Sequence, residues 1–190
     1  YGESTAVLAG NSLLTMAFEI LSDKNLKITS KSKVFLIEKL SKCSGHLGIA
    51  GGQFLDLSFE HKKVSKKKII EMEMKKTGKL FSFCCVAPLI VKNKNIKDRN
   101  IFEKIGLDIG LLFQIADDLI DYQGSTKKAG KKTRKDQELG KATLISLLGY
   151  KNAIKYGYNL KSKILNVLRI YGNKTEDIHE TLNYILTRNK

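Results

Sequence analysis

The sequence predicts an all-α protein, folded as a single helical domain over residues 1–190. Apolar residues recur at spacings of three and four along most of the chain, which is the helical period. The chain has only one proline, Pro88, whereas an all-β chain needs turn residues about every 8–12 positions. Hydrophobic residues make up 42% of the chain, so it can bury a core and is not a disordered tail.

Three helical segments are expected in the first half of the chain. The first runs from Ser4 to Leu21, where apolar residues recur at threes and fours rather than alternating. The second runs from about Ser32 to Phe59, and the third from Ser65 to about Val91. Pro88 predicts a kink or an early end in the third segment, because proline cannot donate a backbone hydrogen bond.

Three more helical segments are expected in the second half. The fourth runs from about Asp98 to Tyr122. The fifth covers roughly Thr143 to Ile170, with a break at Gly149 or Gly157. The last is short and follows Thr175, a residue type that favours the N-cap position.

The chain is strongly basic, with 34 Lys+Arg against 19 Asp+Glu and a formal net charge of +15. Nearly all of these cations are lysines spread over every segment, which favours a solvated surface over a nucleic-acid interface. The longest near-continuous apolar run, Phe81 to Val91, is shorter than the roughly 18–20 residues that span a bilayer, so no membrane span is expected. Three cysteines without zinc-site spacing fit a reducing cytoplasm.

Three aspartates, Asp117, Asp118 and Asp121, lie within five residues near the C-terminal end of the fourth helix. Aspartate is a poor interior helix former, the helix dipole repels anions there, and like charges four apart repel each other. A hard cation such as Mg²⁺ relieves all three costs. Gln114 lies on the same face as Asp117, three residues earlier. The alternative is an acidic patch on a solvated helix.

Two other groups of polar residues could complement such a cation. Lys76 and Thr77 precede the apolar stretch Leu80 to Val86, which suits an anion with an apolar tail, although lysines are more often simply exposed. Gln53 and Asp56 lie three apart on one helical face. They follow two glycines that permit close helix packing or a kink.

The segment from Gln123 to Ala142 is polar, glycine-punctuated and lysine-rich, and we expect a loop of functional length there. Lys131 and Lys141 bracket its second half and could close over a phosphate. A loop lysine is more often only solvated.

Taken in order and at these distances, the motifs resemble the trans-polyprenyl diphosphate synthases, and most closely the bacterial farnesyl diphosphate synthase group. The matching segments are Tyr1-Gly2-Glu3 with Leu8 to Leu14, Gly51-Gly52-Gln53 with Leu55-Asp56, Lys76-Thr77-Gly78, Phe113-Gln114 with Asp117-Asp118 and Asp121, Gly130-Lys131 with Asp136 and Gly140-Lys141, and Tyr184 to Lys190. The chain departs from the family pattern at Asn11, Arg134 and Leu144-Ile145. The family's first aspartate-rich motif lies before the first of these segments, so the chain looks like the C-terminal two-thirds of such an enzyme.

This resemblance implies a helical bundle of the isoprenoid synthase type around a deep central cleft, usually homodimeric. It implies an Mg²⁺-dependent enzyme that condenses an allylic diphosphate, dimethylallyl or geranyl, with isopentenyl diphosphate to a short trans-prenyl diphosphate such as farnesyl diphosphate. The residues it assigns are Asp117, Asp118 and Asp121 to metal binding, Lys76, Thr77, Gln114 and Lys131 to catalysis, and Gln53, Asp56, Lys76, Lys131 and Lys141 to substrate binding.

Two other classes of function stay open at this point. The chain could be a non-catalytic, prenyl synthase-like partner subunit, because half of the family's metal site is absent from it. A basic helical protein that binds nucleic acid is the second alternative, and its binding would depend steeply on salt.

Overall fold

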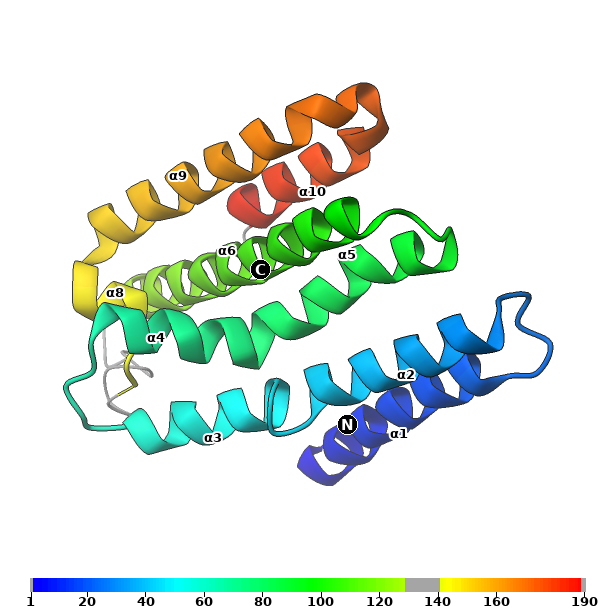
Figure 1. Ribbon diagram of the computed structural model, residues 1–190. Helices are drawn as coiled ribbons and strands as arrows, with labels where there is room; N and C mark the ends of the chain where they lie inside the picture. The colour runs from blue at the N-terminus through cyan, green and yellow to red at the C-terminus, as the bar shows by residue number, and fades with distance from the viewer. Residues whose placement is uncertain (1, 129–140, 189–190) are drawn as a thin grey trace.

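The protein folds into a layered bundle of α-helices, and the part of the chain that the structure describes contains no strand (Figure 1). This computed structural model describes residues 2–128 and 141–188, except for the side chains of 125–128. The prediction of an all-α protein is confirmed. In chain order the elements are α1 (Glu3–Ser22), α2 (Ser30–Ser44), α3 (Ile49–Phe59), α4 (Lys66–Glu73), the π-helix η1 (Met74–Gly78), α5 (Lys79–Val91), α6 (Ile96–Lys128), α8 (Leu144–Leu148), α9 (Tyr150–Leu168), the 3-10 helix η2 (Arg169–Thr175) and α10 (Glu176–Thr187).

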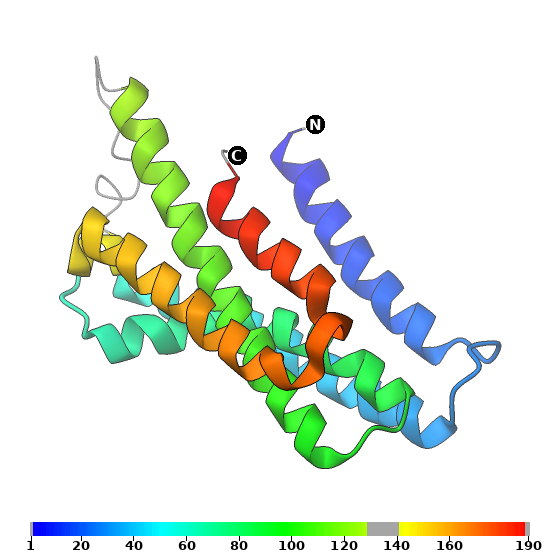
Figure 2. The same ribbon diagram turned by 90° about the horizontal axis from the view of Figure 1, so that it is seen from above.

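Helix α6 runs through the middle of the bundle, with α4 and α5 on one side and α9 and α10 on the other (Figures 1 and 2). It carries more charged residues than α1, yet its buried aliphatic residues supply the centre of the core. Burying one large aliphatic side chain stabilises a fold by about 1.5–3 kcal/mol. The buried residues that α6, α9 and α10 contribute include Ile105, Ile109, Leu111, Leu112, Ile115, Leu160, Ile164, Leu168, Leu182 and Ile185.

Two of the predicted helices are divided in the structure. The helix expected over about 32–59 is two helices, α2 and α3, because the chain reverses tightly between them. At Gly48, a Cβ atom would lie 1.8 Å from the carbonyl oxygen of Cys43, so only glycine fits this turn. The helix expected from Ser65 contains the π-helix η1, and it ends at Val91, shortly after Pro88. The early end that proline predicts is therefore observed.

The second half of the chain differs from expectation in smaller ways. Helix α6 continues to Lys128, beyond its expected end at Tyr122. The predicted break falls at Gly149, which has a φ of 76°, whereas Gly157 is buried within α9. Thr175 takes the N-cap position of α10, but its hydroxyl donates to the carbonyl of Gly172 at 3.0 Å and caps no backbone N–H.

Close backbone contacts bring α3, η1 and α6 together. A Cβ atom on Gly52 of α3 would lie 2.2 Å from the backbone nitrogen of Lys76 in η1. A Cβ atom on Gly110 of α6 would lie 2.5 Å from the Cα of Gly78, also in η1. Glycine at these positions lets the three elements pack backbone against backbone. The close packing that the sequence predicts for the glycine pair before Gln53 is confirmed at Gly52.

The Gly52→Ala variant is expected to lose about 1–3 kcal/mol of unfolding free energy, because the added methyl must displace the backbone of η1. Urea denaturation measures this loss. Gly10→Ala is the matched control, because a Cβ there meets no described atom within 4 Å and the site is helical. We expect this control to be neutral or stabilising by up to about 1 kcal/mol. Equal losses at both positions would contradict the close contact.

Helix α1 stands apart from the core. None of its residues, all of which the structure describes, is buried, and it lies at the edge of the bundle beside α2 (Figure 2). By length and composition it could cross a membrane, a test that core helices of soluble proteins also pass. A search for one continuous apolar run misses it, because serine, threonine and asparagine interrupt its apolar residues. Its exposed large apolar side chains are Val7, Leu8, Leu13, Leu14, Met16 and Ile20.

Candidate functional site

Polar side chains from three elements meet where η1 passes between α3 and α6. Lys76 donates from Nζ to Oδ2 of Asp56 at 2.6 Å. Thr77 donates from Oγ1 to Oε1 of Gln114 at 3.1 Å, and Nε2 of Gln114 donates to Oδ1 of Asp118 at 2.9 Å. These five residues, which the sequence already singles out, form what we call the central polar cluster.

The π-helical turn η1 positions the two middle members of this cluster. A π-helical turn closes i→i+5 hydrogen bonds and is frequent at functional sites. Here Lys76 reaches the carboxylate of Asp56 on α3, and its neighbour Thr77 reaches Gln114 on α6. The sequence carries no signal for a π-helix, so the division of the two side chains between different partners is a result of the structure.

The carboxylates of the central polar cluster are held in a desolvated environment. Asp56 is 7% exposed and Asp118 is 8% exposed. A buried carboxylate is costly unless it is paired, and the Lys76 ammonium and the Gln114 amide meet this need. The Lys76 side chain remains 28% exposed. A cation fixed by a buried partner and still open to solvent is suited to bind an anion.

Glu73, which sequence reasoning missed, lies buried beside the cluster and is 4% exposed. Its Oε2 has no hydrogen-bond partner among the described atoms. Burial, together with the nearby carboxylates of Asp118 and Asp56, raises the pKa of Glu73 to about 8, against the opposing ammonium groups of Lys76 and Lys141. A glutamate one helical turn before Lys76, in an apolar part of α4, is the signal that could have revealed it.

The Glu73→Gln variant is expected to become more stable than the wild type as pH rises. The folded-state pKa of about 8 lies above the ordinary value of 4.5, so the folded protein keeps a proton that the unfolded chain releases between these values. The favourable contribution of Glu73 is complete below 4.5 and is lost progressively up to pH 8. Glutamine keeps the shape and cannot ionise. Above pH 8, the unfolding free energy of Glu73→Gln should exceed that of the wild type by more than about 2 kcal/mol.

Urea denaturation at about pH 5, 7 and 9 measures this difference. Glu71→Gln is the control, because Glu71 is exposed on the same helix and pairs with Lys75 at 3.2 Å. If the difference in unfolding free energy between Glu73→Gln and the wild type does not change with pH, Glu73 is already ionised in the folded protein.

Asp117 and Asp118 point to different partners, because consecutive residues project about 100° apart around a helix. Asp117 forms an ion pair with Arg188, directly after α10, and the Arg188 guanidinium lies 4.0 Å from the centroid of the Phe113 ring. Burial raises the pKa of Asp117 above its usual range, the Arg188 charge opposes this, and the charge of Asp121 adds to it.

Within the described ranges, no three His, Cys, Asp or Glu side chains are grouped so that they could hold one metal ion.

An aromatic surface borders the central polar cluster. Phe81, one turn after Thr77, packs against Phe113, the neighbour of Gln114, with 5.3 Å between ring centroids. The apolar stretch that the sequence predicts as a wall lies in helix α5, so only one side of it can face the cluster. Val86 on this helix is buried in a different part of the core.

The remaining predicted site residues lie outside the cluster. Gln53 is exposed on α3. Lys141, just before α8, is half-buried and close enough to Glu73 to affect its pKa. Lys131 and Asp136 fall outside the residues that the structure describes.

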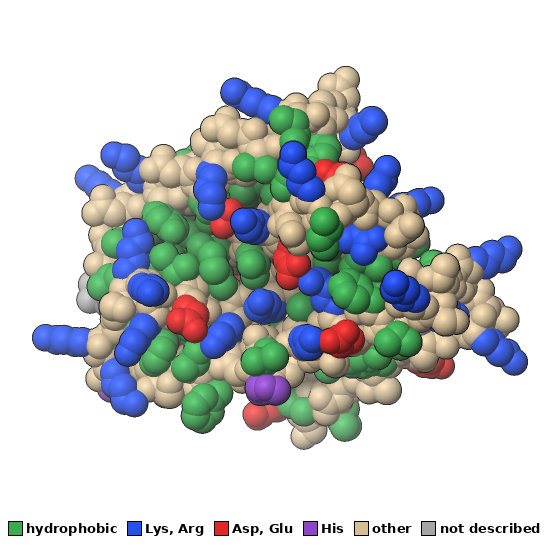
Figure 3. Space-filling view, in the orientation of Figure 1, with side chains coloured by type: hydrophobic (Ala, Val, Ile, Leu, Met, Phe, Trp, Pro, Cys, Tyr) green, Lys and Arg blue, Asp and Glu red, His purple; other side chains and the backbone are tan. Residues whose placement is uncertain are grey.

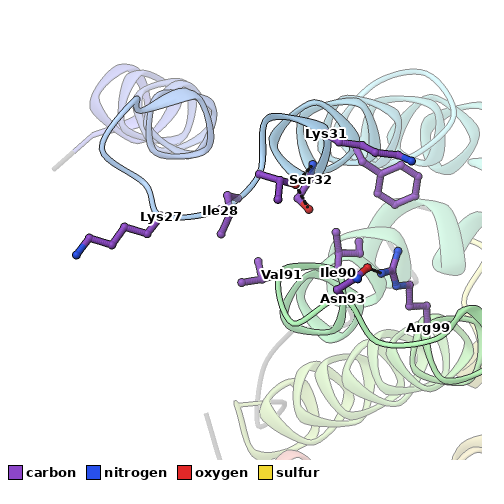
Figure 4. A pocket seen from close by; sticks show the side chains of 10 residues that line it. Lys27, Ile28, Lys31, Ser32, Ile90, Val91, Asn93 and Arg99 are labelled. Atoms are coloured by element: carbon purple, nitrogen blue, oxygen red, sulfur yellow. Dashed lines mark hydrogen bonds between the residues drawn. The ribbon is translucent and has the colours of Figure 1, made fainter.

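A cavity of about 890 Å³ lies away from the cluster, between the first turns of α2 and α6 and the end of α5 (Figure 4). Lys31 lies on its α2 side, and Arg99 lies on the opposite side and donates to Oδ1 of Asn93 at 3.2 Å. Its wall combines cations with apolar side chains such as Ile90. None of the described site residues that the sequence predicts lines it.

The positive charge of the protein is not gathered into one patch on the face seen in Figure 3. Lys and Arg side chains are scattered there among apolar and neutral ones. Such a distribution differs from the single basic stripe that a nucleic-acid interface presents.

Comparison with known proteins confirms the resemblance to polyprenyl diphosphate synthases that the sequence motifs indicate. The polyprenyl synthetase family profile matches residues 1–186. The farnesyl diphosphate synthase of Escherichia coli is 34% identical over 100% of this chain and 65% of its own length. A crystal structure of an FPP/GFPP synthase from Zymomonas mobilis superposes with a TM-score of 0.81 at 35% identity, over 96% of this chain and 61% of that one.

A geranyltransferase from Helicobacter pylori, solved with magnesium and isoprenyl diphosphate, superposes with a TM-score of 0.78 at 34% identity. That match covers 98% of this chain and 60% of the other. The chain thus spans less than two thirds of the length of each of these three relatives.

Proposed function

Because this chain belongs to the polyprenyl synthetase family, we propose that the protein is a prenyltransferase that condenses an allylic diphosphate with isopentenyl diphosphate. The allylic substrate is dimethylallyl or geranyl diphosphate, and the product is a short trans-prenyl diphosphate such as farnesyl diphosphate. The carbon–oxygen bond to the allylic diphosphate breaks, a carbon–carbon bond forms to isopentenyl diphosphate, and a proton leaves to the released diphosphate.

The central polar cluster beside an aromatic surface is the observation that supports this proposal most. Lys76 would donate to an oxygen of the allylic diphosphate and disperse the charge that the leaving group gains. Its carboxylate partner Asp56 holds the ammonium in place, and Gln114 holds the Thr77 hydroxyl in the same way. Preformed donors of this kind need little rearrangement when the charge develops.

The aromatic surface suits the other half of the substrate. Phe81 and Phe113 offer apolar contact to a prenyl tail beside the cluster. An apolar surface also keeps water away from an allylic carbocation, which water would quench. We place Thr77, Gln53 and Asp56 along the wall near the reacting carbon, and Lys131 and Lys141 near the diphosphate.

The aspartates of α6 fit a divalent metal ion. Asp117 and Asp121 lie one turn apart, and Asp117 already attracts the guanidinium of Arg188. Mg²⁺ in proteins uses one or two carboxylates and completes its shell with water and substrate phosphates. Asp117 and Asp121 would hold the ion, with Asp118 fixed beside them by Gln114. When bound there, Mg²⁺ supplies Lewis-acid stabilisation of the leaving diphosphate.

We further propose that the protein works as a homodimer in the cytoplasm. A second copy would cover the apolar side chains that α1 exposes, among them Leu8 and Leu13, which are 65% and 66% exposed. The cysteines are free, as is usual in a reducing compartment. Sedimentation of the complete protein measures its oligomeric state.

An assay of the complete protein with labelled isopentenyl diphosphate and geranyl diphosphate tests the proposed reaction. We expect a longer prenyl diphosphate in the presence of Mg²⁺ and none with EDTA. Binding of both diphosphates without turnover would favour the non-catalytic partner subunit instead. Salt-sensitive DNA binding without prenyl transfer would favour the nucleic-acid alternative.

A further inference from the structure

Arg188 is docked against α6 at Asp117 and Phe113 by two interactions. Its Nη2 donates to Oδ1 of Asp117, and its guanidinium carbon lies 4.0 Å from the centroid of the Phe113 ring, within the range of a cation–π contact. The Arg188 side chain is only 12% exposed. A cation therefore already occupies a carboxylate that the proposed function assigns to metal binding.

The two partners of this ion pair differ in their access to solvent. The Asp117 side chain is 40% exposed, so a dissolved ion can reach it while Arg188 is docked. One donor of the docked guanidinium is unsatisfied, because its Nε is buried without a hydrogen-bond partner among the described atoms. A buried donor without a partner lowers the stability of the docked state. Docking is thus favourable, and it can be reversed.

Docking changes the charge that a metal ion would meet. Asp117 and Asp121 together carry a charge of −2 when both are ionised, and the guanidinium reduces this to −1. A divalent ion at Asp117 would also lie within a few ångströms of the positive guanidinium, which repels it. Metal binding and docking of Arg188 therefore oppose each other.

The structure provides space into which Arg188 can turn. A cavity of about 210 Å³ lies between α6, α9 and the end of α10, and Arg188 forms part of its wall. Tyr150 and Tyr158 of α9 also line it. The Tyr150 hydroxyl already accepts from Nε2 of Gln123, whereas the Tyr158 hydroxyl can accept from a guanidinium. The cavity therefore offers the guanidinium a polar partner when it leaves Asp117.

We propose that Arg188 is a built-in counter-cation, which occupies Asp117 until a divalent metal ion displaces it. Metal binding at α6 is thereby coupled to release of Arg188 from Asp117. The inference rests on the proposed function in one respect, namely that Asp117 and Asp121 form the metal site.

Binding of Mn²⁺ to the complete protein, followed by electron paramagnetic resonance at low salt, tests the proposal. The Arg188→Ala variant should bind Mn²⁺ about 3- to 10-fold more tightly than the wild type, the effect of removing a partly exposed competing charge. Arg169→Ala is the matched control, because it removes the same charge from an exposed site on η2. It should change the affinity less than about twofold. In an Asp117→Asn background, Arg188→Ala should bring no gain.

Hydrogen exchange of the last turn of α10 gives a second measurement that does not depend on turnover. By linkage, an ion that displaces Arg188 must also loosen this turn. Saturating Mn²⁺ should therefore speed amide exchange over residues 184–188 in the wild type, and it should have no such effect in Asp117→Asn.

The outcomes separate this inference from the proposed function. Equal Mn²⁺ affinities in the wild type, Arg188→Ala and Arg169→Ala would overturn the counter-cation and leave the metal site standing. No saturable Mn²⁺ binding in Arg188→Ala, even with inorganic diphosphate present, would overturn both. Unchanged exchange at saturating Mn²⁺ would show that the ion and the docked arginine coexist, which also overturns the proposal.

Discussion

Replacing Asp117 with alanine in the complete protein is expected to lower prenyl-transfer turnover at least about 100-fold. The variant removes a carboxylate from the proposed metal site, and the Lewis-acid contribution of one metal ion is several kcal/mol, at about 1.36 kcal/mol for each factor of ten. Asp117 is 40% exposed, so little core volume is lost and helicity should not change. Steady-state kinetics and far-ultraviolet circular dichroism measure the two effects.

Asp108→Ala is the control for this experiment. Asp108 lies on the same helix and pairs with Lys163 at 2.8 Å, away from the central polar cluster. Its loss should leave turnover within about threefold of the wild type, because single ion pairs of this kind contribute little. Near-normal turnover of Asp117→Ala would show that Asp117 holds no metal ion that the reaction needs.

The second large effect is expected at the lysines. Lys76→Ala and Lys131→Ala should each lower kcat/KM by about 30- to 1000-fold, which corresponds to roughly 2–4 kcal/mol for one preorganised donor. Lys66→Ala and Lys67→Ala, which remove the same charge from exposed sites on α4, should have small effects. Added salt should mask the small effects and leave the large ones, because direct contact in a desolvated site is poorly screened.

The ion pair with Asp56 makes a sharper test of Lys76 possible. Lys76→Ala leaves the carboxylate of Asp56 buried without its cation, so the variant should also be less stable. Combining Lys76→Ala with Asp56→Asn removes the unpaired charge and should restore much of the melting temperature. If the double variant regains stability but not kcat/KM, Lys76 acts on substrate. Recovery of both would assign Lys76 a purely structural role.

Lys67 is the better of the two control lysines. The ammonium of Lys66 lies 4.3 Å from the centroid of the Tyr156 ring, so its removal also costs a packing contact. Equal, small and salt-masked effects at all four lysines would remove the site assignment and leave only a basic surface.

Much of the fold follows from local sequence pattern, because the helical period repeats every few residues. The apolar segment that becomes α6 marks the centre of the core, and Pro88 marks the end of α5. The break at Gly149 was also predictable, whereas the divisions of the helices expected over 32–59 and from Ser65 were not. The turn at Gly48 and the π-helix η1 depend on contacts with the rest of the bundle, which a local period does not describe.

Residue type and spacing in the sequence are enough to propose which residues carry the chemistry: the aspartates of α6, and Lys76, Thr77, Gln114 and Asp56. Tertiary structure alone decided their partners. Lys76 meets a carboxylate 20 residues away, Thr77 an amide 37 residues away, and Asp117 an arginine 71 residues away. It also buried Glu73 and raised its pKa. Residue type and helical spacing are local properties, whereas ion pairs and desolvation arise from the way distant helices cross.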